Sequence, residues 1–189
     1  MHYSITRTLI WISFKILFQI KIERRAQFPA KGQPFVFASN HLSYFDPAIL
    51  SIASPRRLCF FGKEELFKNK LLAFAVKAYG TFPVKRGESD IAGMRNALKI
   101  LKKYPVVVFP QGTRGASLDQ INPGVGFLCK KAKVPIMVAK IYGSDKILPK
   151  GAKFPKIAKL RVITDKVDYT SKDTYEEIAK RVMEKIKSL

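Results

Sequence analysis

Among the side chains of this sequence, a histidine and an aspartate between Ser39 and Pro47 are the best spaced to do chemistry. The segment reads Ser-Asn-His-Leu-Ser-Tyr-Phe-Asp-Pro. Imidazole has a free pKa near neutrality, so His41 could take the proton from a hydroxyl nucleophile. A carboxylate on its far ring nitrogen, from Asp46, would fix the tautomer and stabilise the imidazolium. On one continuous helix the two residues would lie about 140° apart, so the pairing requires a turn between them. The proline after Asp46 predicts that turn, with a helix over residues 47–51.

The same spacing also permits a purely structural interpretation. Asp46 would then cap the helix, and His41 would be a histidine satisfied in the core or at a strand end. Ser43 is a competing nucleophile, because it lies close to His41 in the chain. However, no strand-turn-helix Gly-x-Ser-x-Gly elbow surrounds Ser43, which argues against acyl-serine chemistry.

Two later loops place cations and glycine at the ends of predicted strands. Thr81 to Gly87 reads Thr-Phe-Pro-Val-Lys-Arg-Gly, and Val107 to Gly115 reads Val-Val-Phe-Pro-Gln-Gly-Thr-Arg-Gly. Glycine lets backbone amides approach a phosphate, and arginine matches phosphate oxygens bidentately, so both loops are candidate anion sites. Taken singly, each loop is more often explained as a solvated Lys-Arg pair or a glycine turn.

In their order along the chain, these patterns resemble the 1-acylglycerol-3-phosphate acyltransferase family. The matching patterns are Asn-His-x-x-x-x-Asp from Asn40, Phe-Pro-Val-x-Arg-Gly from Phe82, Phe-Pro-x-Gly-Thr-Arg from Phe109, and Val134-Pro-Ile. Supporting segments are Lys63-Glu-Glu-Leu66 and Ile147-Leu-Pro-Lys-Gly151. The resemblance extends from about Phe35 to Gly151.

The resemblance implies a role for each of these positions. His41 would be the general base and Asp46 its orienting partner. The substrate-binding residues would be Arg86 and Arg114 as phosphate ligands, with Lys63, Gly87, Gln111, Gly112 and Thr113 completing a polar pocket. No metal and no cofactor are implied.

Gln111 departs from the family, which usually has glutamate at this position. Glutamine keeps the shape and a hydrogen-bonding oxygen but removes a negative charge beside Arg114. The change would either free Arg114 for phosphate or remove a contact that orients it. A decayed, inactive site is a further alternative for this position.

The implied reaction moves a fatty acyl chain from acyl-CoA or acyl-carrier protein to the sn-2 hydroxyl of lysophosphatidate, giving phosphatidic acid. Glycerol-3-phosphate and other lyso-lipids are alternative acceptors. Thioester cleavage drives such a transfer without ATP, and the sequence has no Gly-Lys-Ser/Thr phosphate loop.

Short apolar runs alternate with helical periodicity and predict an α/β fold, a mixed central β-sheet flanked by helices. The predicted strands are residues 35–38, 58–61, 106–109, 136–141 and 160–163, with a further short strand at the start of the Thr81 loop. Helices are predicted over residues 91–103 and at the C-terminal end, where Tyr175, Ile178, Val182 and Ile186 form the buried stripe.

The charge balance points to an anionic partner. The 189 residues include 35 Lys and Arg against 14 Asp and Glu, a formal net charge of +21, and 47% are hydrophobic. Lipid is favoured over nucleic acid, because no nucleic-acid motif is present and the basic residues are spread along the whole chain. A non-catalytic basic module that binds membranes or nucleic acid is the alternative from another class. Cys59 and Cys129 have no partner spacing, and a buried thiol is the expectation for Cys129.

The N-terminal run from Leu9 to Ile22 is apolar but is interrupted by Lys15, Gln19 and Lys21. It is too short to span a bilayer, and its Trp and basic residues favour a helical segment at the membrane interface. The alternative is a helix packed on the domain. We therefore expect a membrane-associating segment over residues 1–27 and an acyltransferase domain over 28–189. The protein would lie at the cytoplasmic face of a membrane, peripheral or monotopic, on an anionic lipid surface.

Overall fold

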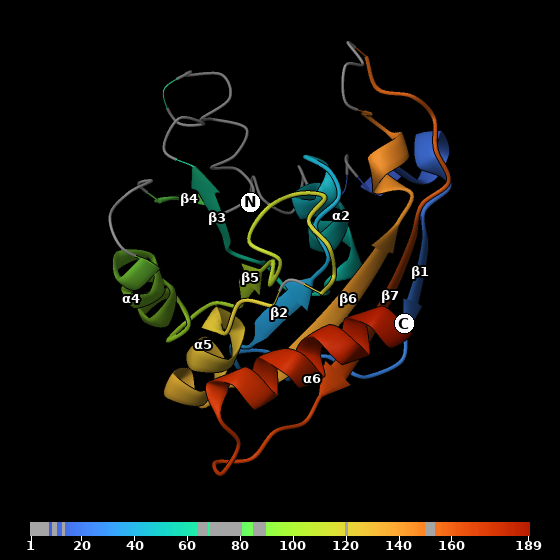
Figure 1. The fold of residues 1–189 in the computed structure, drawn as a ribbon. Coiled ribbons are helices and arrows are strands. Elements are labelled where there is room, and N and C mark those ends of the chain that lie inside the picture. Colours follow the sequence, from blue (N-terminus) through green and yellow to red (C-terminus); the bar gives the residue numbers. More distant parts are fainter. Residues whose placement is uncertain are drawn as a thin grey trace.

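The computed structural model describes residues 8, 11–12, 14–63, 68, 81–84, 90–119, 121–149 and 154–189. Its strands and helices alternate along most of the chain (Figure 1). The strands are β1 (Lys21–Arg24), β2 (Val36–Ser39), β3 (Phe60–Lys63), β4 (Thr81–Val84), β5 (Val106–Val108), β6 (Ile136–Tyr142) and β7 (Arg161–Val167). The helices are α2 (Asp46–Ala53), α4 (Asp90–Ile100), α5 (Gly124–Ala132), the 3-10 turn η2 (Ser144–Lys146) and α6 (Tyr175–Ser188).

The central sheet has five strands in the order β1-β7-β6-β2-β5. Strand β2 pairs in parallel with both β5 and β6, so these three strands end at the same edge of the sheet. Strand β7 runs antiparallel to β6, and β1 is parallel to β7. The fold is therefore a mixed α/β sheet with helices on its faces, as the sequence predicted.

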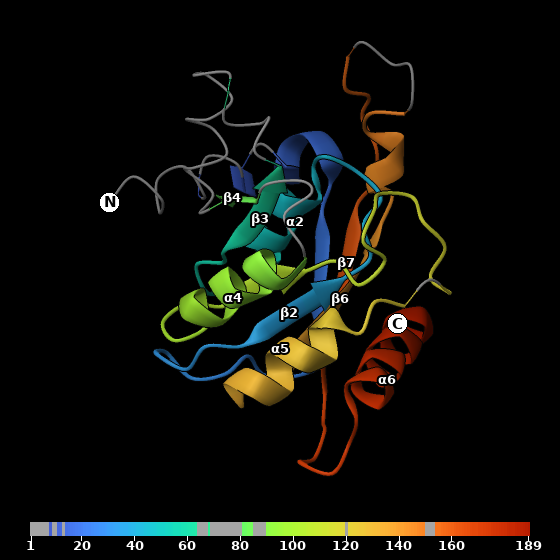
Figure 2. The same ribbon diagram turned by 60° about the vertical axis from the view of Figure 1, so that its left-hand side comes forward.

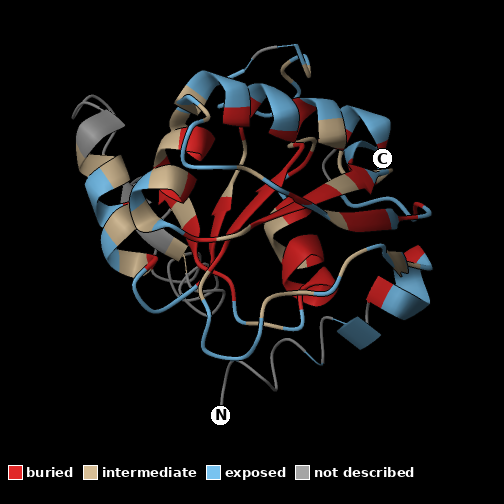
Figure 3. Cartoon of the chain, turned by 90° about the horizontal axis from the view of Figure 1, so that it is seen from below, coloured by how far each residue is buried: buried red, intermediate tan, exposed pale blue. Residues whose placement is uncertain are grey.

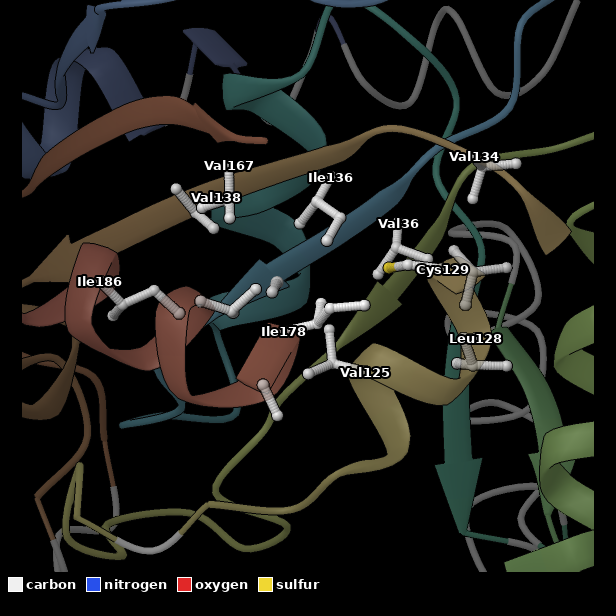
Figure 4. Close-up of a cluster of buried hydrophobic side chains, with 14 of the residues drawn as sticks. Val36, Val125, Leu128, Cys129, Val134, Ile136, Val138, Val167, Ile178 and Ile186 are labelled. Carbon is white, nitrogen blue, oxygen red and sulfur yellow. The ribbon is translucent and has the colours of Figure 1, made fainter. Parts of the chain in front are cut away.

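Alternation along β2 gives the sheet two buried faces. Phe35 and Phe37 point to one face, where the buried residues of α2 pack, and Val36 and Ala38 point to the other. The second face is covered by α5 and α6, whose apolar side chains meet Ile136 and its neighbours (Figure 4). Viewed from below, buried residues fill the strands and the inward sides of the helices (Figure 3). Each helix layer thus holds one face of β2 in place.

Helices α5 and α6 lie close together below the sheet (Figure 2). A Cβ on Gly126 would come within 2.1 Å of the carbonyl oxygen of Tyr175, so this contact requires a residue without a side chain. A capping box fixes the start of α6, because Thr174 and Glu177 exchange side-chain and backbone hydrogen bonds. The predicted buried stripe of α6 is confirmed for Ile178, Val182 and Ile186, while Tyr175 is half-buried.

A small parallel pair, β3 and β4, extends from the outer edge of the central sheet. It is joined to that sheet by a bridge between Cys59 and Val106. The strand predicted over residues 58–61 is found two residues further along the chain, as β3. The short strand predicted at the start of the Thr81 loop is present as β4.

The N-terminal segment is only in part the predicted helical segment. Residues 14–18 are helical, but Gln19 has a left-handed backbone (φ 44°), and Lys21–Arg24 form strand β1. Phe14 and Phe18 are buried in the α2-side core. The helix stops because the following residues pair with β7, a partner distant in sequence. Among the described residues, no helix combines the length and the apolar composition needed to cross a bilayer.

Candidate functional site

His41 and Asp46 form a hydrogen-bonded pair just past the end of β2. His41 Nδ1 lies 2.8 Å from Asp46 Oδ2. The carboxylate can only accept, so the proton of this bond belongs on Nδ1 and leaves Nε2 with a free lone pair. The Asp46 side chain is fully buried, whereas 18% of the His41 side chain is exposed. The pair therefore combines a shielded carboxylate with an imidazole that a substrate can reach.

Asp46 also shapes the turn that brings it to His41. Its Oδ2 accepts from the backbone N–H groups of Leu42 at 2.6 Å and Ser43 at 2.8 Å. Asp46 is the first residue of α2, where the helix dipole stabilises a negative charge, and Pro47 occupies the first turn. Within the described part of the chain, its second oxygen, Oδ1, is buried without a partner. Three hydrogen bonds to Oδ2 fix the position of the Asp46 side chain.

His41 is held on its other sides by β2, β5 and β6. Its ring stacks on Phe109 with centroids 4.0 Å apart and planes 15° from parallel. The preceding residue, Asn40, donates to the carbonyl oxygen of Ile141 at 2.8 Å and accepts from its N–H at 2.7 Å. Asn40 thereby prolongs the β2–β6 pairing beyond the end of β2 and fixes where the chain leaves the sheet.

Gln111 connects His41 to the loop that follows β5. The Gln111 side chain is buried, and its Oε1 accepts from the backbone N–H of His41 at 2.8 Å. Its Nε2 donates to the carbonyl oxygen of Ala116. The backbone N–H of Gly115 in turn donates to the carbonyl oxygen of His41 at 2.8 Å. Both polar ends of the amide are thus used inside the protein, and both backbone groups of His41 are tied to one loop.

Arg114 lies at the exposed rim of this site. Its guanidinium carbon sits 3.2 Å from the centre of the Tyr44 ring, and Tyr44 belongs to the turn between His41 and Asp46. Gly112 and Gly115 have φ values of +76° and +71°, which glycine adopts at little cost and which allow the loop to fold back. A cation is therefore placed against the turn between His41 and Asp46, on a side chain that remains exposed to solvent.

The structure describes only some of the other predicted site residues. Thr113 is exposed in the same loop as Arg114. Lys63 is the last residue of β3, at the end of the small sheet. Arg86 and Gly87 lie outside the described residues, as do Glu64 to Leu66 and Lys150 to Gly151 of the supporting segments.

Ser43 is engaged in the turn and not with the imidazole. Its Oγ accepts from the backbone N–H of Phe45 at 3.3 Å, and its side chain is buried. Across the described residues, no hydrogen bond joins Ser43 to His41. The arrangement favours a structural role for this hydroxyl over that of a nucleophile.

The two cysteines are buried free thiols. Burial raises the pKa of Cys59 to about 11 and moves the pKa of Cys129 upward as well. Both therefore remain protonated near neutral pH, when a thiolate would be required for nucleophilic attack.

Sequence reasoning assigned no role to Phe109 or Tyr44. Phe109 lies within the Phe-Pro-x-Gly-Thr-Arg pattern and Tyr44 within the turn of the first pattern, so both were inside segments already singled out. Only their position in these segments could have indicated a role, because a ring contact between the ends of separate strands leaves no local pattern in the sequence. The stacking on His41 required the pairing of β2 with β5.

A buried carboxylate hydrogen-bonded to a partly exposed imidazole at the end of a strand is an arrangement that can support general-base chemistry. Comparison of the sequence with family models gives the particular family. Residues 19–141 match the model of the Acyltransferase family, and the chain belongs to that family.

Curated relatives share about a quarter of their aligned residues with the chain. It is 27% identical over 112 residues to the 1-acyl-sn-glycerol-3-phosphate acyltransferase of Streptococcus pneumoniae, covering 58% of this chain and 42% of that protein. It is 28% identical over 156 residues to the chloroplast enzyme LPAT1 of the same name from Arabidopsis thaliana, covering 80% and 44%. The alignments therefore span less than half the length of each of these two relatives.

The fold is shared with a solved structure. The 1-acyl-sn-glycerophosphate acyltransferase PlsC of Thermotoga maritima aligns with a TM-score of 0.79 at 21% identity. The alignment covers 98% of this chain and 77% of that one. At this identity the likeness establishes the architecture of the chain.

Proposed function

We propose that the protein transfers a fatty acyl chain from acyl-CoA or acyl-carrier protein to the sn-2 hydroxyl of 1-acylglycerol-3-phosphate, giving phosphatidic acid. The observation that carries the proposal is the bond between His41 Nδ1 and Asp46 Oδ2 at 2.8 Å, at a site where His41 is partly exposed. Membership of the Acyltransferase family and the names of the relatives supply the acyl-transfer chemistry and the acceptor.

The pair supports a direct transfer. His41 Nε2 takes the proton of the acceptor hydroxyl while Asp46 stabilises the imidazolium that forms. The hydroxyl oxygen then bonds to the thioester carbonyl carbon, the carbon–sulfur bond breaks, and the thiolate leaves with the proton from Nε2. His41 returns to its starting state, and this route requires no acyl-enzyme. Holding both substrates beside the base supplies much of the rate enhancement.

We assign the predicted binding residues two kinds of role. Arg114, exposed at the rim, binds the acceptor phosphate, together with Arg86, Gly87, Gly112, Thr113 and Lys63. Gln111 is a positioning residue, because its amide is buried and both ends are occupied by His41 and Ala116. The amide donor, which a carboxylate lacks, supports glutamine as a functional choice in this chain and not as a mark of decay.

A second acceptor is favoured by one relative. The chain is 27% identical over 105 residues to a lyso-ornithine lipid O-acyltransferase of Pseudomonas aeruginosa, covering 54% of this chain and 40% of that protein. A lyso-lipid without the glycerol phosphate is therefore a competing acceptor, as is glycerol-3-phosphate.

We also propose that residues 1–27 associate with an anionic membrane at its cytoplasmic face, with residues 28–189 as the acyltransferase domain. In the N-terminal segment, Trp11, Ile16 and Leu17 are exposed, whereas Phe14 and Phe18 anchor the segment to the core. Strand β1 links this segment to the central sheet. Deleting residues 1–25 would remove β1 and part of the core, so point substitutions are the better test.

The deciding experiment is an acyl-transfer assay on purified protein in detergent. It crosses acyl-CoA and acyl-carrier protein with lysophosphatidate, glycerol-3-phosphate and lyso-ornithine lipid. We expect transfer to lysophosphatidate to exceed transfer to the other acceptors. No transfer to any acceptor with either donor would refute the proposed function. A preference for lyso-ornithine lipid would show that this lipid, and not lysophosphatidate, is the acceptor.

A further inference from the structure

Large apolar side chains are exposed most strongly in a segment that the proposed function does not use. Phe154 and Ile157 are 79% and 80% exposed, the highest values for large hydrophobic side chains in the described part of the chain. Four more exposed residues belong to the N-terminal segment, namely Trp11, Ile12, Ile16 and Leu17. Single exposed apolar residues are common, but several in two adjoining segments indicate an interaction surface.

The two segments lie side by side although they are far apart in sequence. The backbone N–H of Leu160 donates to the carbonyl oxygen of Phe18 at 3.1 Å, and the N–H of Lys21 donates to that of Leu160 at 2.9 Å. The N–H of Lys156 donates to the carbonyl oxygen of Ile147 at 2.7 Å, which ties the second segment to the end of η2. Figure 1 shows both segments at the same end of the molecule, beyond the ends of β6 and α2.

Each segment divides its apolar residues between the core and the solvent. Phe14 and Phe18 of the first segment, and Ala158 and Leu160 of the second, are buried in the α2-side core. The exposed side chains are therefore not needed to attach the two segments to the core, because the buried residues already do so. Folding of the chain alone leaves Phe154 and Ile157 in water, which costs free energy that a partner could recover.

The charges around these residues select the partner. Lys15, Lys156 and Lys159 are exposed within the two segments, and Lys15 Nζ lies 4.8 Å from the centre of the Trp11 ring. Lys146 is exposed in η2, where Asp145 is the neighbouring carboxylate. Lysines interleaved with bulky apolar side chains and tryptophan match the boundary between anionic headgroups and acyl chains.

We propose that residues 154–157 are a second membrane-contacting element, which joins residues 11–17 in one docking surface for an anionic bilayer. The surface is joined to the catalytic pair through the core, because the Phe14 ring lies 6.3 Å from that of Phe45, the residue before Asp46. The use of this docking surface in lipid acylation rests on the proposed function, but membrane binding is measured independently of turnover.

The test compares the full-length wild type with the double variant Phe154→Ser/Ile157→Ser in vesicle sedimentation. Vesicles of phosphatidylcholine with phosphatidylglycerol are the anionic probe, and pure phosphatidylcholine is the neutral one. Tyr104→Ser is the matched control, because Tyr104 is 36% exposed and precedes β5, at the edge of the sheet opposite His41. We expect the double variant to lose at least about tenfold in partitioning onto anionic vesicles, and the control to lose little.

A second measurement reports insertion directly. Trp11 is the sole tryptophan, so Phe154→Trp in a Trp11→Phe background provides a single fluorophore in the new element. Its emission should shift to the blue when anionic vesicles are added. Unchanged sedimentation of the double variant, or a fluorophore at position 154 that stays in water while the protein is bound, would overturn the proposal.

The outcome is separable from that of the enzyme assay. The double variant should keep wild-type turnover on a soluble short-chain acceptor, since neither residue touches the pair, and lose activity only on acceptor presented in vesicles. A wild type that binds vesicles through residues 154–157 but transfers no acyl chain would refute the proposed function and leave the docking surface standing.

Discussion

The proposed catalytic pair, His41 and Asp46, and the nearby Arg114 are held in opposite ways. Asp46 is fully buried, and three hydrogen bonds converge on one of its oxygens. Arg114, by contrast, is exposed, and its guanidinium lies against the exposed ring of Tyr44. Proton transfer requires fixed distances, whereas capture of a substrate phosphate requires a side chain that can leave its resting contact. Substitutions in the two regions should therefore differ in kind, and the following experiments test that difference.

Replacing the base should have the largest effect on turnover. His41→Ala removes the group that accepts the hydroxyl proton, and we expect turnover to fall by about 10²- to 10⁴-fold. The acceptor KM should change little, and the urea unfolding midpoint should stay near that of the wild type. A variant that turns over at a near wild-type rate would contradict the mechanism, and one that fails to fold would assign His41 to the core.

Asp46→Asn should impair both turnover and stability, which separates it from His41→Ala. Turnover should fall steeply, because the imidazolium loses its anionic partner. Stability should fall by about 1–3 kcal/mol, since charged acceptor bonds to Leu42 and Ser43 are weakened in a buried site. Urea unfolding of both variants measures the contrast. Equal stability of the two would show that Asp46 does not organise the turn.

Gln111→Glu tests the two hydrogen bonds by which the Gln111 amide joins His41 to Ala116. A carboxylate can accept from His41 N–H but cannot donate to Ala116, so its charge would face a carbonyl oxygen. We expect about a tenfold fall in kcat with little change in acceptor KM. Burial raises the pKa of the introduced carboxyl, and its protonated form can donate again.

The activity of Gln111→Glu relative to the wild type should therefore increase as the pH falls. Taking the ratio at each pH removes the pH dependence that the two enzymes share. A ratio independent of pH, with a raised acceptor KM, would show that Gln111 contacts the substrate and does not position His41.

Arg114→Ala should raise the KM for lysophosphatidate by about 10- to 100-fold, because charge-assisted hydrogen bonds to phosphate are lost. Turnover at saturation and unfolding should change far less than in the Asp46 variant. Lys131→Ala, an exposed cation on α5, is the control for net charge. An equal loss with a phosphate-free acceptor would show that Arg114 does not bind phosphate.

Thiol modification should have the smallest effect. Burial raises the pKa of Cys59 to about 11 and that of Cys129 as well, so both thiols are protonated and shielded at neutral pH. N-ethylmaleimide should therefore leave activity unchanged in the folded enzyme and label both residues only in urea. Rapid inactivation of the folded enzyme would place a reactive thiol near the site.

The sequence was sufficient for the parts of the fold that local patterns determine. Helix α2 follows from Asp46-Pro47, and the buried stripe of α6 follows from helical periodicity. Strand β1 was missed because Lys21–Arg24 has a charged residue at three of its four positions and owes its conformation to β7. A strand made by a distant partner leaves no signal in its own residues.

The candidate site divides in the same way. The pairing of His41 with Asp46 was predictable, because the intervening turn is encoded next to it. The roles of Phe109 and Gln111 depend on how β5 is aligned with β2, and that register depends on the whole core. Spacing along the chain cannot show that Gln111 faces inward while Arg114, three residues later, faces water.

The pairing of β1 with β7 also sets an order of events during synthesis. Lys21 lies opposite Arg161, so the edge of the sheet cannot close until more than a hundred further residues have left the ribosome. Contacts of such high sequence separation form late, because the loop between them must first be ordered. During that interval strand β1 has no partner, and the side chains of Trp11 and Leu17, which are exposed even in the folded chain, are free to meet a lipid surface. The segment is therefore available to a lipid surface before β7 has been synthesised.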